Sequence, residues 1–256
     1  MFELDPSVFQ SLIPRLDDVP FNTWFARSVL AGHVNGRVFV DDLIDPSSVY
    51  IYHDYGMALL LGDTPSSGFA DAMVKYLRSL RKSNWIQVFP DLGAKFLQCL
   101  VDDGTVRLAT RINFVFDQDR FEPILNKPMP DRLVVTDGTT NLIRQIEGRV
   151  VPRYFWKRSE LNSCVSRVAF VDHEYAGIAF ASFLHGDVLE IGTETAEPYR
   201  RMGVAENVCS ALIRYCLAEG LTPVWACRQH NTGSMKLAQR LGFVETISLP
   251  YYCVDP

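Results

Sequence analysis

The 256-residue sequence predicts an α/β (α+β) protein with two domains. Helix-like segments, with apolar residues three or four positions apart, alternate along the chain with short apolar runs typical of strands. The composition, 48% hydrophobic and 21% charged, is that of a folded chain and argues against long disordered tails or a coiled coil. Three prolines from Pro123 to Pro130 interrupt both patterns, because proline lacks the amide donor that a helix or inner strand needs. We therefore expect an N-terminal α/β domain over residues 1–125 and a second domain over residues 126–256.

Two helices are expected at the start of the first domain. Asp5 precedes an amphipathic stretch that includes Phe9 and Leu12, and Asn22 is suited to cap a second helix that begins at Thr23. The rest of this domain is predicted to alternate strands, at 37–40, 49–52, 57–61, 85–89 and 106–116, with helices at 69–81 and 93–101.

The second domain is predicted to be richer in strands. Apolar runs indicate strands at 133–135, 165–171, 176–183, 188–195, 223–227, 243–247 and 251–254. Helices are expected at 141–146, 203–218 and 232–241, the last two followed closely by Gly220 and Gly242.

The charge and the cysteines limit the class of protein. The formal charge is −5 and neither half has a basic surplus, which argues against a dedicated nucleic-acid binder. No apolar run approaches the roughly 20 residues that span a bilayer, and the acidic start does not resemble a signal peptide. Cys227 and His230 are the only Cys and His at metal-like spacing, so we expect no metal site. Six cysteines without a Cys-x-x-Cys pair favour a reducing, cytoplasmic location: Cys99, Cys164, Cys209, Cys216, Cys227 and Cys253.

Residues 190–205 combine a strand, a short loop and a glycine-bearing helix start. The first amides of a helix lack intrahelical partners and carry partial positive charge, so a helix N-terminus favours a phosphate. Gly203 and Ala205 have little or no side chain and would let a pyrophosphate approach these amides, while Arg200 and Arg201 would add charged donors.

Two motifs resemble those of the GNAT superfamily of acyl-CoA-dependent N-acetyltransferases. Arg200-Arg-Met-Gly203-Val-Ala205 is similar to motif A, whose pattern is Arg/Gln-x-x-Gly-x-Gly/Ala. Asn231-Thr-Gly-Ser234, followed by Leu241-Gly-Phe243, is similar to motif B. The resemblance covers the chain from about residue 165 onward. It implies a GNAT fold, a mixed and mostly antiparallel sheet flanked by helices, with an N-terminal domain that shapes the acceptor pocket or is a degenerate GNAT-like copy.

A finer resemblance extends over nearly the whole chain. Val38-Phe-Val-Asp41-Asp42 before a hairpin, together with Glu190-Ile-Gly-x-Glu194-Thr195, is similar to the zwittermicin A resistance type of GNAT protein.

The resemblance implies acetyl-CoA as the acyl donor and no metal. The strand backbone at Glu194, Thr195 and Ala196 would pair with the pantetheine arm, as an added strand pairs with a sheet edge. Asn231 and Ser234 would contact the pantetheine or support the site. The pyrophosphate would be held by Arg200 and by the amides of Arg201, Met202, Gly203, Val204 and Ala205.

Two carboxylates on one strand are candidates for acid–base work. An ammonium group is not nucleophilic, so a base must remove its proton before it attacks an acetyl carbonyl. Glu190 lies near the place where family members carry a glutamate base, and Glu194 shares its strand parity.

The proton donor to the leaving thiolate is not evident, because Ala238 occupies the position where many GNAT proteins have tyrosine. Tyr251, Tyr252 or a water would replace it, or the thiolate leaves unassisted. We expect an N-acetyltransferase that acts on a small-molecule amine. The alternative is a non-catalytic acyl-CoA-binding sensor or interaction module.

Overall fold

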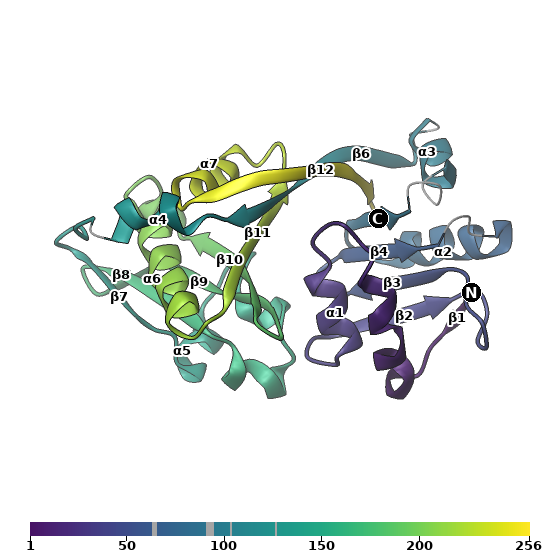
Figure 1. The fold of residues 1–256 in the computed structure, drawn as a ribbon, viewed down its shortest axis with the longest axis horizontal. Coiled ribbons are helices and arrows are strands. Elements are labelled where there is room, and N and C mark those ends of the chain that lie inside the picture. Colours follow the sequence, from purple (N-terminus) through teal and green to yellow (C-terminus); the bar gives the residue numbers. More distant parts are fainter. Residues whose placement is uncertain (63–65, 91–94, 103, 126) are drawn as a thin grey trace. The chain divides into compact units, whose positions relative to one another are not determined.

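A computed structural model describes residues 1–62, 66–90, 95–102, 104–125 and 127–256. The chain forms two compact units (Figure 1). Unit 1 comprises Met1–Arg111 and Ser248–Pro256, and unit 2 comprises Ile112–Ile247. The proline-rich segment lies within unit 2, where Pro123 is part of helix α4 (Gln118–Leu125).

Unit 1 is built on a mixed sheet with the strand order β1-β2-β3-β4-β5-β12-β6. Neighbours from β1 to β4 are antiparallel, β4 and β5 are parallel, and β5 and β12 are antiparallel. The strands are β1 (Phe2–Glu3), β2 (Gly36–Val40), β3 (Val49–His53), β4 (Met57–Leu61), β5 (Asn84–Phe89), β6 (Val106–Phe116) and β12 (Phe243–Val254).

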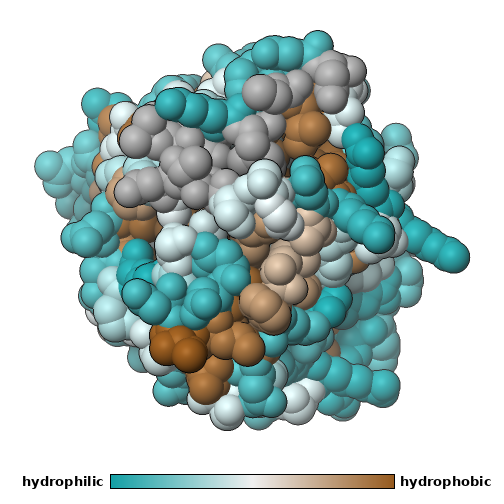
Figure 2. Space-filling model, turned by 90° about the vertical axis from the view of Figure 1, so that its right-hand side faces the viewer, coloured by the Kyte–Doolittle hydropathy of each residue, from teal (hydrophilic) through white to brown (hydrophobic). Residues whose placement is uncertain are grey.

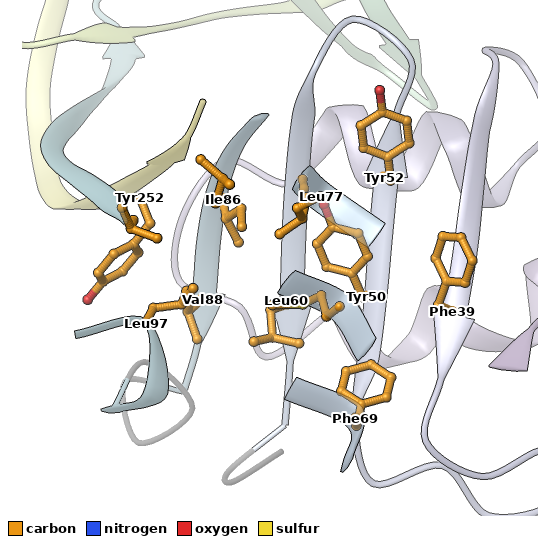
Figure 3. Close-up of a cluster of buried hydrophobic side chains, with 14 residues drawn as sticks. Phe39, Tyr50, Tyr52, Leu60, Phe69, Leu77, Ile86, Val88, Leu97 and Tyr252 are labelled. Carbon is orange, nitrogen blue, oxygen red and sulfur yellow. The ribbon is translucent and has the colours of Figure 1, made fainter. Parts of the chain in front are cut away.

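The helices of unit 1 bury apolar stripes against this sheet. They are η1 (Pro6–Leu16), α1 (Trp24–Leu30), α2 (Ser67–Ser79) and α3 (Lys95–Asp102). Asp5 caps η1 by accepting the amide of Ser7 at 2.9 Å, and α1 packs against β3 and β4. Phe69 and Leu77 of α2 join Ile86 of β5 in one buried cluster (Figure 3). Figure 2 shows one face of the molecule as mostly hydrophilic, with hydrophobic areas between.

Unit 2 contains the second sheet, with the strand order β12-β6-β11-β10-β9-β8-β7. Neighbours from β7 to β10 are antiparallel, and β10 and β11 are parallel. Its remaining strands are β7 (Leu133–Asp137), β8 (Ser166–Val171), β9 (Glu174–His185), β10 (Val188–Thr195) and β11 (Thr222–Arg228).

The longest helix of unit 2 packs on the centre of its sheet. Helix α6 (Val204–Ala218) contacts β8, β9 and β10 and buries residues three or four apart, among them Val208, Leu212 and Cys216. The other helices are α5 (Thr140–Gln145), α7 (Thr232–Arg240), and the short turns η3 (Pro152–Tyr154), η4 (Arg158–Ser163) and η5 (Glu197–Tyr199).

The two units repeat one order of elements. In each, four antiparallel strands lead to a helix, then to a fifth strand parallel to the fourth, then to a second helix and a long strand. The helix after the fourth strand is α2 in unit 1 and α6 in unit 2, and the second helix is α3 or α7. Strands β6 and β12 each contribute residues to both units, because the unit boundaries fall at 111/112 and 247/248.

Most predicted elements are present, the start of the helix expected at 93–101 lies outside the described residues, and two of the differences involve proline. The expected strands at 243–247 and 251–254 are a single strand, β12, which continues through Pro250. Helix α4 was not predicted, because Pro123 lies inside it and proline usually marks the end of a helix.

Candidate active site

A pocket of about 470 Å³ lies in unit 2 at the end of β10 and the starts of α6 and α7. Its lining includes several residues singled out in the sequence: Glu194, Thr195, Arg200, Arg201, Gly203, Val204, Ala205, Asn231 and Ser234. Glu190, Ala196, Met202 and Tyr252 are not among the lining residues. The pocket therefore gathers both sequence motifs, which are about thirty residues apart in the chain.

Strands β10 and β11 separate beside this pocket. Their parallel pairing runs from Val188 opposite Thr222 to Glu190 opposite Val224 and extends no further along these two fully described strands. Strand β10 continues to Thr195, paired with β9 on its other side. A strand that has lost one neighbour offers backbone donors and acceptors to an extended ligand.

The backbone amides at the start of α6 are not capped by a side chain. Arg201 has φ +63° and Gly203 has φ +80°, so the chain turns twice through the left-handed region just before the helix. Gly203 is the N-cap residue, and no side chain caps the helix there. Successive amides in such a turn form a concave donor surface, and the helix dipole adds partial positive charge. This is the local geometry that binds a phosphate.

The start of α7 is held by a small polar network. The Asn231 side chain accepts the amide of Ser234 at 3.2 Å, which caps the helix. The Ser234 hydroxyl in turn accepts the indole N–H of Trp225 at 3.0 Å, and this bond joins α7 to β11. Asn231 and Ser234 thus fix the part of the pocket wall that the start of α7 provides.

Glu190 occupies the point at which the two strands separate. It is the last β10 residue paired with β11, and the pairing of β10 with β9 shifts register between Glu190 and Ile191. Its side chain is buried, with the residue 5% exposed, and its carbonyl accepts the hydroxyl of Ser182 at 3.0 Å. Its burial at the point of strand separation makes Glu190 the candidate for a general base.

Glu194 has a different environment from Glu190. Its Oε2 accepts the amides of Arg149 and Val150 at 2.7 and 2.5 Å, so the carboxylate fastens the loop before η3 to the end of β10. A Cβ atom placed on Gly148 would lie 2.6 Å from that oxygen. Glycine at 148 is therefore what lets the loop approach the carboxylate.

Tyr252 lies in the core of unit 1. It is 5% exposed and belongs to the same buried cluster as Val88 and Leu97, beside which Figure 3 shows it. Ala238, at the position where motif B proteins often have tyrosine, is fully buried in α7.

The pocket also contains residues that the sequence analysis did not single out, among them two cations and a tyrosine. Lys236 and Arg240 line it from α7, and Tyr199 lines it from the loop before α6. The spacing of Lys236 and Arg240, four residues apart on one helix, was the available signal.

At the equivalent place in unit 1, the described residues show neither an uncapped helix start nor a separated strand pair. Helix α2 is capped by the hydroxyl of Ser66, which accepts the amide of Phe69 at 3.3 Å. Strands β4 and β5 stay paired along all of β4, from Met57 opposite Trp85 to Leu61 opposite Phe89. The amide of Gly62 then donates to the carbonyl of Phe89 at 3.0 Å, so this strand pair remains closed where β10 and β11 have opened.

The described cysteines are buried and are not grouped with one another. The five whose side chains are described are all free and buried. Burial raises the pKa of Cys209 and of Cys216 to about 12, so both thiols stay protonated near neutral pH. Within the described ranges, no three His, Cys, Asp or Glu side chains are grouped as metal ligands would be, and no helix is long and apolar enough to cross a bilayer.

Comparison with known proteins agrees with this geometry. Residues 161–252 match the family model described as GNAT acetyltransferase. An uncharacterized N-acetyltransferase of Bacillus subtilis (strain 168), YdfB, is 26% identical over 248 residues, which cover 94% of each chain.

Solved structures resemble the chain over nearly its whole length. A GCN5-related N-acetyltransferase-like protein from Streptococcus suis has a TM-score of 0.77 at 20% identity, covering 97% of this chain and 99% of the other. A tandem GNAT protein from the clavulanic acid biosynthesis pathway has a TM-score of 0.61 at 12% identity, covering 98% and 96%. The chain thus has the GNAT fold, and residues 161–252 are similar to the GNAT acetyltransferase family.

Proposed function

We propose that this protein transfers an acetyl group from acetyl-CoA to the amine of a small molecule. The observation that carries the proposal is the coincidence, in one pocket, of an uncapped helix start with a strand end that has lost its neighbour. The first feature suits a pyrophosphate and the second suits the peptide-like pantetheine arm.

The donor would lie along the pocket in a definite order. The pantetheine arm would pair with β10 near Thr195 and Ala196, and the amides from Arg201 to Ala205 would hold the pyrophosphate with Arg200. Asn231 and Ser234 would support the pantetheine from α7. Because β10 and β11 part after Glu190, the thioester would enter between them.

Glu190 is proposed as the general base. It would take a proton from the acceptor's ammonium group, and the free amine would then attack the acetyl carbonyl. Collapse of the tetrahedral intermediate breaks the carbon–sulfur bond and releases the thiolate of CoA, which takes up the second proton lost by the attacking nitrogen. Glu194 is proposed to hold the 148–151 loop, because its carboxylate already accepts two amides there. With Tyr252 in the unit 1 core, the thiolate leaves without a named side-chain acid.

The remaining features of the proposal concern the chain as a whole. The repeated order of elements supports a boundary near residue 125 between two GNAT-like domains, and the solved tandem GNAT protein is a precedent for such a pair. The zwittermicin A resistance type is the subfamily we propose. A cytoplasmic location is consistent with the buried free thiols.

Release of free thiol from acetyl-CoA across a panel of amines tests the activity. Glu190→Gln is expected to lower kcat at least 100-fold, because a carboxamide cannot accept the proton, while the Kd for CoA changes less than twofold. Glu197→Gln, an exposed carboxylate in η5 outside the pocket lining, serves as the matched control and should keep its activity. If Glu190→Gln instead abolished CoA binding, its assignment as the base would be wrong.

A non-catalytic acyl-CoA-binding module is the second candidate. Ala238 favours it, since a buried alanine supplies no proton to a leaving thiolate. Tight CoA binding in calorimetry without thiol release for any amine would select this function over catalysis.

A further inference from the structure

Four basic side chains line the pocket, and the sequence motifs account for only two of them. Arg200 and Arg201 belong to the loop before α6, whereas Lys236 and Arg240 come from α7. Residues four apart on a helix lie on the same face, so α7 presents a second pair of cations to the same space. The pocket is therefore basic on two sides.

The two acidic side chains of the pocket already have partners. Glu206 pairs with Lys127 at 2.5 Å and with Arg240 at 3.7 Å, and Glu194 accepts two backbone amides. With four cations and two anions, the lining has a surplus of two positive charges in a chain whose formal charge is −5.

Three of these cationic side chains have no partner among the described residues. The side chains of Arg200, Arg201 and Lys236 form neither an ion pair nor a hydrogen bond there. Arg240 is shared with Glu206, so Lys236 is the uncommitted charge on the α7 side.

Coenzyme A carries two separate anionic groups, and one helix start serves only one of them. The amides at the start of α6, with Arg200 and Arg201, match the pyrophosphate. The ribose 3′-phosphate is a monoester with about −1.5 to −2 charges at pH 7 and needs cations of its own. Lysine is a compact charge with three rotatable donors, which suits a phosphate whose orientation is not fixed in advance.

We infer that Lys236, supported by Arg240, binds the 3′-phosphate of the acyl donor and makes the pocket selective for CoA over carriers that lack this phosphate. This assignment rests on the proposed function, since it places a second contact on the same donor.

Calorimetric titration with CoA and with 3′-dephospho-CoA tests the inference. The wild-type chain should bind CoA at least tenfold more tightly, and Lys236→Met should lower that preference to less than threefold by weakening CoA alone. Lys236→Arg should restore most of the preference, because the charge is kept. Arg144→Met removes an exposed cation of unit 2 outside the pocket lining and should leave both affinities unchanged.

The pH dependence gives an independent readout. The second proton of a phosphate monoester has a pKa of about 6, so the group loses charge as the pH falls below that value. The preference of the wild-type chain for CoA should therefore be full above pH 7 and decline below pH 6, whereas the affinity for 3′-dephospho-CoA should not follow this curve.

The possible failures are distinguishable. Equal losses for both ligands in Lys236→Met, or equal binding of both by the wild-type chain, would overturn the 3′-phosphate assignment and leave the proposed function intact. Absence of any CoA binding by the wild-type chain would overturn the proposed function itself.

Discussion

At the residue scale, the two strand glutamates that share a sequence parity have different surroundings. Glu190 is buried where β10 and β11 separate, whereas Glu194 lines the pocket and accepts two amides of the 148–151 loop. A carboxylate that accepts backbone amides is already satisfied, and its removal would leave those donors without a partner. We therefore treat Glu194 as a residue that positions the loop and Glu190 as the candidate base.

Gly148→Ala tests the loop attachment. The added Cβ would lie 2.6 Å from Glu194 Oε2, so either the loop or the carboxylate has to move, and we expect the free energy of unfolding to fall by about 1–3 kcal/mol. Thermal and denaturant unfolding measure the change. Gly68→Ala adds the same methyl group where no atom lies within 4 Å, and it should not destabilise the chain. Equal stability of the two variants would contradict the attachment.

The sequence predicted much of the candidate site at this scale and left out specific parts. Arg200, Gly203 and Asn231 were found because their spacing follows from helix starts, which are local features. Lys236 and Arg240 were missed because exposed cations on a helix are common, and only the tertiary contact of α7 with α6 distinguishes these two. Tyr252 was a candidate proton donor because it belongs to a tyrosine pair near the end of the chain. The local sequence does not indicate in which unit such a side chain is buried.

At the element scale, α6 begins and ends with glycines in the same backbone region. Gly203 has φ +80° at the start and Gly220 has φ +68° just after the end. Neither would crowd a neighbour if it carried a Cβ atom, since the nearest contact of Gly203 is 3.5 Å and Gly220 has none within 4 Å. Glycine is therefore favoured at both positions by the positive φ and not by lack of room for a side chain. Only Gly203 lines the pocket.

This symmetry supplies a matched pair of variants. Gly203→Ala and Gly220→Ala should each cost about 1–2 kcal/mol of unfolding free energy, because an L-residue is strained at positive φ. Only Gly203→Ala should also weaken CoA binding, by tenfold or more, since it displaces the amides proposed to hold the pyrophosphate. Calorimetry and denaturant unfolding separate the two effects. Similar CoA affinity in both variants would show that the α6 start does not hold the donor.

Element positions were easier to predict than element continuity. The strand at 106–116 was predicted with its observed bounds, and the hairpin of β3 and β4 follows from two apolar runs around a glycine turn. Strand β12 was divided at Pro250, because proline normally excludes an inner strand position. Its continuity depends on neighbours that come from other parts of the chain.

At the scale of the whole molecule, two copies of one topology differ in the features that we propose receive the acyl donor. Unit 2 has an uncapped α6 and a strand pair, β10 and β11, that separates. In unit 1 the Ser66 hydroxyl accepts the amide of Phe69, and β4 and β5 stay hydrogen-bonded as far as Gly62. The repeated topology could be predicted only weakly from the sequence, because the two halves share an order of elements and not a motif.

The difference predicts the stoichiometry of binding. Calorimetric titration of the intact chain with CoA should give one site per chain. At the start of α2, the hydroxyl of Ser66 already accepts an amide that a phosphate would otherwise bind. Two equivalent sites per chain would contradict this account. In Gly203→Ala the heat of this single site should diminish without a second site becoming visible.

The shared strands have a consequence for biosynthesis. Residues 248–254 of β12 lie between β5 and β6 in unit 1, yet they are translated only after all of unit 2. Until residues 248–254 are translated, the position between β5 and β6 has no strand in it. Unpaired strand edges of this kind are places where a strand of another chain can add. The half of the polypeptide that is made first is thus the half that is completed last.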